Sequence, residues 1–174
     1  MEKQTLENET EENHANFKIE YALRPNHKPC SPFKNILSWP TAFKITLNGT
    51  VLAIKKDYGN GDICEYQSPG YTFDPTNINS LLRKIIDDKE CYFQLGDGKH
   101  IPLKFSPLEN GDYEISIVRK DLNEKIAGFD YENLKPAKVT KKRIIKEFSE
   151  YLSRMYEDLE KYHEFELLKS LKGE

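Results

Sequence analysis

The chain has 174 residues, of which 37% are hydrophobic and 32% are charged, and its formal net charge is −3. That length is enough for one well-formed hydrophobic core, and an aromatic content of 11% excludes a wholly disordered chain. The bulk charge excludes both a strongly basic nucleic-acid binder and a strongly acidic mimic of nucleic acid.

The first 15 residues are polar and acidic, and they show no apolar periodicity. They hold five glutamates and one lysine; removing these from the totals of 29 acidic and 26 basic side chains leaves 24 and 25. The body of the chain is therefore nearly neutral. We predict a disordered tail over residues 1–15 and a single domain over residues 16–174.

Alternation of apolar and polar residues predicts the first strands. It runs through residues 17–23, and again through residues 43–47 and 51–54 on either side of Asn48-Gly49. An Asn-Gly pair between two apolar runs is typical of a tight hairpin, because both residues tolerate the positive φ of a type I′ turn. A further short strand is expected at residues 63–66.

A helix and three strands are predicted in the middle of the chain. Asp74 and Pro75 favour a helix start, as N-cap and first helical residue, and apolar residues at spacings of three and four continue to about Lys89. Short connections then require an antiparallel meander. Its strands are expected at residues 91–95, 101–105 and 113–118.

The longest periodic stretch runs through residues 139–171. As one helix it would be ~50 Å long at ~1.5 Å per residue, whereas a domain of this size is only ~35–40 Å across. The helix therefore breaks near Tyr162-His163, protrudes, or docks its far end on a partner as a helix-mediated oligomer. Together the elements predict an α+β fold: an antiparallel sheet of about six strands packed with one mid-chain helix and one long C-terminal helix.

The sequence contains no recognisable catalytic or cofactor motif. Three widely spaced cysteines, Cys30, Cys64 and Cys91, favour free thiols in a reducing compartment over a disulfide framework. They do not combine with the histidines at the spacing of a zinc site, so we expect no metal, no cofactor and no enzymatic activity. With no signal peptide and no membrane span apparent, the expected location is the cytoplasm.

A basic cluster crowds the start of the last helix, where the macrodipole disfavours cations. The simplest interpretation is a solvated face. The sharper hypothesis is an anion site for nucleic acid, for a partner's acidic patch or for the chain's own glutamate-rich tail. Its residues are Lys138, Lys141, Lys142, Arg143 and Lys146.

The order of the elements, together with certain residues, resembles a loose family of immunity proteins from bacterial polymorphic-toxin systems. The similarity would cover about residues 16–160. It implies a non-catalytic protein that binds and neutralises a cognate toxin, with nucleic-acid or anion binding by the basic cluster as the alternative. The residues that carry it are Phe17 to Tyr21, Tyr92 to Gln94, Ile101 to Phe105, Tyr113 to Ser116, Phe148 and Leu152.

A tight inhibitor needs aromatic anchors and complementary charge, and one polar, aromatic segment offers both. The same tyrosines could instead close the edge of the sheet. The predicted partner-binding residues are Asp57, Tyr58, Asp62, Glu65, Tyr66, Tyr71 and Asp74.

Overall fold

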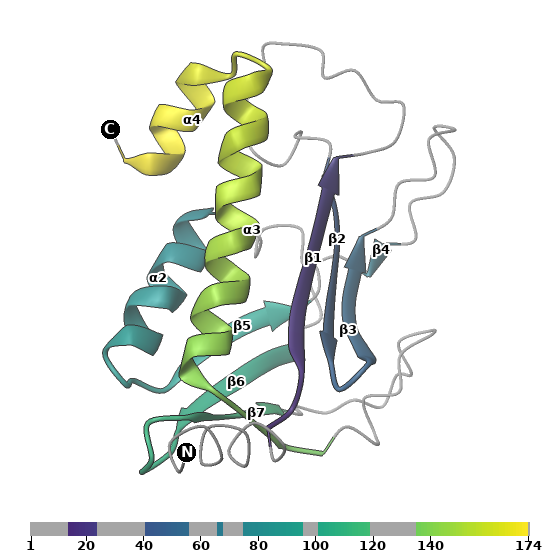
Figure 1. Cartoon of the computed structure of the whole chain (residues 1–174), viewed down its shortest axis with the longest axis vertical. Helices are drawn as coiled ribbons and strands as arrows, with labels where there is room; N and C mark the ends of the chain where they lie inside the picture. Colours follow the sequence, from purple (N-terminus) through teal and green to yellow (C-terminus); the bar gives the residue numbers. More distant parts are fainter. Residues whose placement is uncertain are drawn as a thin grey trace, which may run out of the picture.

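The computed structural model describes residues 14–23, 41–55, 66–67, 75–95, 101–118 and 135–173. These residues form strands that pack against three helices (Figure 1). In chain order the elements are β1 (Phe17–Leu23), β2 (Thr41–Leu47), β3 (Thr50–Lys55), β4 (Tyr66–Gln67), α2 (Pro75–Ile86), β5 (Cys91–Leu95), β6 (Ile101–Pro107), β7 (Tyr113–Ile117), β8 (Ala137–Val139), α3 (Lys141–Lys161) and α4 (Phe165–Lys172).

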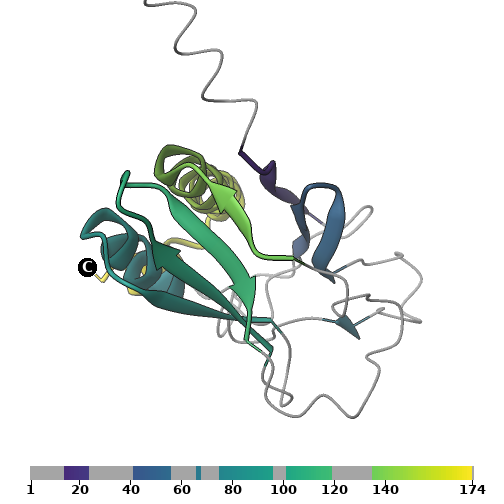
Figure 2. The ribbon, with the colours of Figure 1, turned by 90° about the horizontal axis from the view of Figure 1, so that it is seen from below.

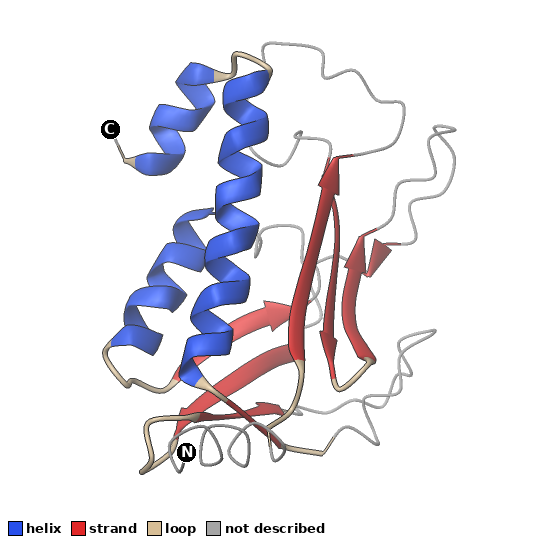
Figure 3. Ribbon diagram, in the orientation of Figure 1, coloured by secondary structure: helices blue, strands red, loops and turns tan. Residues whose placement is uncertain are grey.

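The fold is α+β, as the sequence predicts, but the strands form two antiparallel sheets instead of one sheet of about six strands. The first sheet has the order β1-β2-β3-β4 and the second has the order β5-β6-β7-β8. Helix α2 separates the two sheets in the chain, and Figure 3 shows the helices lying on one side of both. Each sheet buries one face against the shared core. The two sheets can therefore pack together without hydrogen bonds between their strands.

The first sheet contains the hairpin that Asn48-Gly49 predicts. Asn48 has a φ of 49° and Gly49 a φ of 79°, which are the positive values that a type I′ turn requires. The β2–β3 pairing shifts register after Ile45, which pairs with Ala53, while Thr46 pairs with Val51. The extra residue is Leu52, which is fully buried, so the bulge turns an additional apolar side chain into the core.

The second sheet contains the predicted meander and one strand that the sequence does not predict. β5, β6 and β7 pair in succession as expected, and β8 then pairs with β7 through Val139 and Tyr113. β8 has only three residues, which is too short for an alternating pattern to be recognised.

Four phenylalanines join the two sheets at α3. Phe148 of α3 lies 5.8 Å from Phe17 of β1, 5.3 Å from Phe93 of β5 and 6.3 Å from Phe105 of β6, measured between ring centroids. All four side chains are buried, and such ring pairs add to the free energy gained by burial. A single core cluster therefore includes residues from both sheets and from all three helices.

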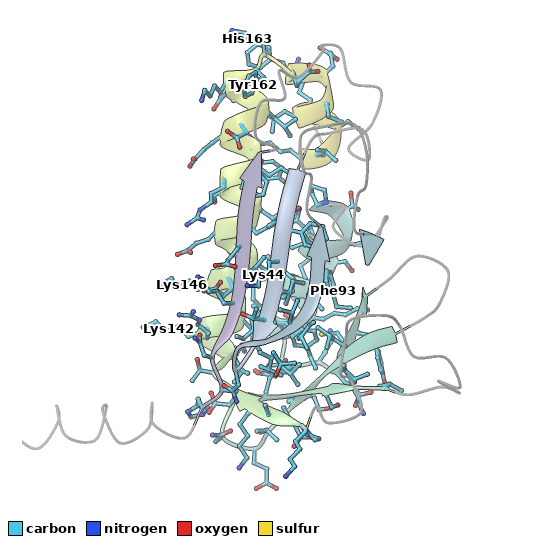
Figure 4. All side chains as sticks on the ribbon, turned by 90° about the vertical axis from the view of Figure 1, so that its right-hand side faces the viewer. Lys44, Phe93, Lys142, Lys146, Tyr162 and His163 are labelled. Carbon is cyan, nitrogen blue, oxygen red and sulfur yellow. The ribbon has the colours of Figure 1, made fainter. Side chains whose placement is uncertain are left out.

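The long C-terminal helix breaks near Tyr162-His163, which is one of the three outcomes that its length allows. α3 ends at Lys161, and His163 has a φ of 60°, a left-handed value that an α-helix cannot contain. Tyr162 and His163 lie at the end of α3 far from Lys142 (Figure 4). The chain then turns back as α4, which buries Leu167 and Leu168 in the same core. The periodic stretch is therefore accommodated within one chain as two helices that pack on the same core.

Helix α2 begins at Pro75 as predicted, and it ends at Ile86, three residues before the expected Lys89. Asp88 has a φ of 54°, so the chain leaves the helical conformation there. No described helix has a stretch long and apolar enough to cross a bilayer.

Candidate functional site

The outer face of the second sheet carries polar side chains from neighbouring strands, among them Lys104, Glu114 and Lys138. We call it the open face, and Figure 2 shows that no helix covers it in the described part of the chain. Tyr113, Ile115 and Val139 point into the core, so their strand neighbours point outward. The register aligns Tyr92 with Lys104, Lys104 with Ser116, and Glu114 with Lys138.

Three side chains of the open face form one hydrogen-bonded cluster, which we call the Tyr92 cluster. The Tyr92 hydroxyl donates to Glu90 Oε1 at 2.7 Å, and Lys104 Nζ lies 2.7 Å from Glu90 Oε2. Tyr92 is 52% exposed, which is unusual for a large aromatic ring. The cluster therefore holds an exposed ring in a defined orientation.

The electrostatics of the Tyr92 cluster follow from these bonds. The Lys104 ammonium, and then the Tyr92 hydroxyl, lower the pKa of the Glu90 carboxyl by bonding to its charged form. The same carboxylate raises the pKa of the Tyr92 hydroxyl and that of Lys104. At neutral pH the cluster thus presents a neutral phenol beside a paired charge, an arrangement suited to recognition of a partner surface.

The predicted partner-binding segment falls almost wholly outside the described residues. Only the backbone of Tyr66 is described; it lies in β4 and pairs with Lys55 at the end of the first sheet. The other six residues, which lie outside the described ranges, are Asp57, Tyr58, Asp62, Glu65, Tyr71 and Asp74.

The basic cluster divides into two groups. Lys141 donates to the carbonyl oxygen of Ile86 at 2.8 Å and to Asp88 Oδ1 at 2.8 Å, so it joins α3 to the end of α2. Arg143 Nε donates to the carbonyl oxygen of Phe17 at 2.8 Å. These two cations are engaged in contacts within the domain.

The other three cations remain exposed: Lys138 lies on the open face, whereas Lys142 and Lys146 lie on α3. We refer to these three residues together as the lysine strip. Lys142 and Lys146 lie one turn apart on α3 (Figure 4), so they share a helix face. Lys146 Nζ is 3.8 Å from Glu150 Oε1. Neither Lys138 nor Lys142 has a carboxylate of a described residue within ion-pairing distance.

Arg143 and Glu147 cover the outer edge of β1, a role that the sequence analysis missed. Ile19 N–H donates to Glu147 Oε2 at 2.7 Å, and Arg143 Nη2 lies 3.1 Å from Glu147 Oε1. With the Arg143 bond to Phe17, the pair satisfies two backbone groups that an edge strand would otherwise leave open. The sequence does contain a sign of this role, because Glu147 falls within the buried stripe of Ile144, Phe148 and Tyr151.

Nucleophilic chemistry finds little support among the described residues. Burial raises the pKa of the Cys91 thiol to about 11, which keeps it protonated and unreactive at neutral pH. The partly buried His14 Nε2 lies 2.9 Å from Asp112 Oδ2, and His100 is outside the described ranges. Within those ranges, no group of three or more His, Cys, Asp or Glu side chains could hold a metal ion.

No family model, no curated protein and no solved structure matches this chain. The similarity to immunity proteins rests on the residues and the element order alone.

Proposed function

We propose that this protein is a non-catalytic binding protein that neutralises a cognate bacterial toxin in the cytoplasm of the producing cell. The observation that carries the proposal is the Tyr92 cluster on the open face. It combines an exposed aromatic ring, a feature that is enriched at the centres of protein interfaces, with two opposite charges of the kind found in the polar rim of an interface.

Preorganisation is the physical reason for choosing this surface. Binding normally costs free energy for each side chain that becomes fixed in an interface. Glu90 already holds the Tyr92 hydroxyl and the Lys104 ammonium at 2.7 Å, so a partner that packs on the ring would immobilise little further. The partner expected here offers an apolar pocket for the ring and a polar rim for the charges.

Growth rescue tests the proposal directly. The toxin domain encoded beside the gene for this chain is expressed in a susceptible host, alone and with the chain. We expect rescue of growth by the chain and a direct complex in calorimetry. Tyr92→Ala should weaken the complex by about tenfold or more, because truncated aromatic anchors at interface centres have effects of that size.

Phe165→Ala is the matched control, because Phe165 is an exposed aromatic residue of α4, on a different element. We expect it to leave the affinity unchanged. Equal losses for the two variants would place the interface elsewhere, with the segment around Tyr58 and Tyr71 as the next region to test. Absence of rescue and of binding, or absence of a neighbouring toxin gene, would contradict the proposed function.

The second candidate function is binding of nucleic acid or another polyanion by the basic cluster. The three exposed lysines favour it, whereas the internal contacts of Lys141 and Arg143 withdraw the other two of the five cations from binding. Three phosphate contacts on a single strand would make the affinity fall about twentyfold between 50 and 200 mM salt. A gel-shift assay with a thymidine 20-mer measures this dependence, and a salt-insensitive or absent shift would exclude it.

A further inference from the structure

The charged side chains of the open face alternate in sign from strand to strand. Glu90, which precedes β5, approaches β6 through the 2.7 Å contact between its Oε2 and Lys104 Nζ. Glu114 of β7 is the cross-strand neighbour of Lys138 of β8. The bond to Glu90 is the main cause of the raised pKa of Lys104, and the nearby charge of Glu114 contributes to it. These four side chains therefore form one line of alternating charge across the sheet, which we call the charge line.

The charge line has no net charge, because its two glutamates cancel its two lysines. Its neighbours in the register are uncharged: Ser106 pairs with Glu114, and Ser116 pairs with Lys104. Opposite charges on adjacent strands lie well within the Debye length, which is ~10 Å at about 0.1 M salt, so each cancels most of the field of the other. The described part of the open face therefore attracts neither a polyanion nor a polycation.

A partner patch of a single sign fits the charge line poorly. Two of the four side chains would attract it, whereas the other two would face like charges, which disfavour a complex. A site that binds phosphate groups is a patch of this kind, because it concentrates lysine and arginine side chains. A patch whose own charges alternate can instead place a cation against each glutamate and an anion against each lysine.

Resting on the proposed function, we infer that the toxin surface that meets the open face carries charges of both signs that cancel, and that it is not a phosphate-binding site. The alternating charges form the rim of the pocket that receives the Tyr92 ring. The Tyr92 hydroxyl already donates to Glu90 Oε1 at 2.7 Å. The ring, and not a further polar group, is therefore what Tyr92 offers to the partner.

Removing one charge at a time reveals the charge of the partner surface. Glu114→Gln leaves the charge line with a surplus positive charge, and Lys138→Gln leaves it with a surplus negative charge; neither residue takes part in the bonds of the Tyr92 cluster. Stopped-flow mixing with the toxin domain encoded beside the gene measures association at about 20 mM salt, where charges are weakly screened. We expect both variants to associate within about twofold of the wild type, because a partner surface without net charge favours neither.

Dissociation should change instead, and by similar factors in the two variants. Each variant loses one exposed ion pair with the partner's rim, so its dissociation rate constant should rise about two- to fivefold. The double variant E114Q/K138Q restores a neutral line and is the matched control for association. Phe165→Ala, which changes an exposed residue of α4, is the control for dissociation.

Opposite changes in association would overturn the inference. If K138Q associated about threefold faster and E114Q about threefold slower, the covered toxin surface would be basic, as a phosphate-binding site is; the reverse pattern would show an acidic surface. If neither variant changed association or dissociation, both side chains would lie outside the interface and the inference would be wrong. The proposed function would still stand if Tyr92→Ala weakened the complex, whereas absence of any complex would contradict the proposed function itself.

Tripolyphosphate provides an independent probe of the covered toxin surface. The affinity of the wild-type complex is measured in millimolar tripolyphosphate and in sodium chloride of equal ionic strength. We expect the same affinity in both, because a surface without net charge does not bind a small polyanion. A lower affinity in tripolyphosphate alone would show that the chain and the polyanion compete for a basic site, which would refute the inference.

Discussion

Glu147 and Glu90 each bind one cation and one further donor, yet they lie in opposite environments. Glu147 is only 7% exposed and accepts from a backbone N–H of β1. Glu90 is 46% exposed and accepts from the side chain of Tyr92. The first carboxylate closes a sheet edge, whereas the second arranges side chains on an uncovered sheet face.

The comparison separates stability from recognition. A buried carboxylate that loses its partners leaves polar groups unsatisfied in a medium that solvates them poorly. When an exposed carboxylate is removed, water solvates its former partners, so the loss costs little free energy. Residues around Glu147 should therefore govern folding, and residues around Glu90 should govern binding with little influence on folding.

Phe148→Ala should have the largest effect, because Phe148 contacts aromatic residues of both sheets. We expect the free energy of unfolding to fall by about 3–5 kcal/mol, the usual cost of a large cavity in a core. Urea denaturation followed by circular dichroism measures it, with the exposed Phe165→Ala as the control. A loss below about 1 kcal/mol, or two separate transitions for the two sheets, would refute the shared core.

Glu147→Ala should have the next largest effect, about 2–3 kcal/mol, since Ile19 N–H loses a charged acceptor and Arg143 loses its partner. The same denaturation experiment applies. Glu90→Ala removes the matching exposed carboxylate and should change stability far less. Equal losses for the two variants would show that burial does not distinguish them.

Much of the fold could be predicted because it depends on local geometry. A few neighbouring residues predict the Asn48-Gly49 turn and the helix start at Pro75. The length of the C-terminal stretch left three outcomes open, of which the structure shows the break near Tyr162-His163. The division into two sheets could not be predicted, because alternation shows that a strand is half-buried but not which strand lies beside it.

The candidate site was harder to predict, for the same reason. Tyr92 and Lys104 become neighbours only through the β5–β6 register, and Ile19 meets Glu147 across 128 residues of chain. The basic cluster was visible in the sequence, but spacing alone could not show that Lys141 and Arg143 bond to backbone carbonyl groups.

The smallest expected effect is on the pKa of the Glu90 carboxyl, the exposed member of the two glutamates compared. The pKa of Glu90 lies below its ordinary value of 4.5, mainly because of Lys104 and next because of Tyr92. Lys104→Gln should therefore raise the pKa of this carboxyl toward 4.5 more than Tyr92→Phe does, as measured by carbon-13 carboxyl shifts in an NMR titration. A lowered pKa stabilises the folded state above pH 4.5, and that contribution is lost as the pH falls through the folded value. Glu20, whose pKa is lowered mainly by Lys18, should titrate identically in both variants; a parallel shift of Glu20 would mean that the substitutions act on the whole domain and not on the Tyr92 cluster.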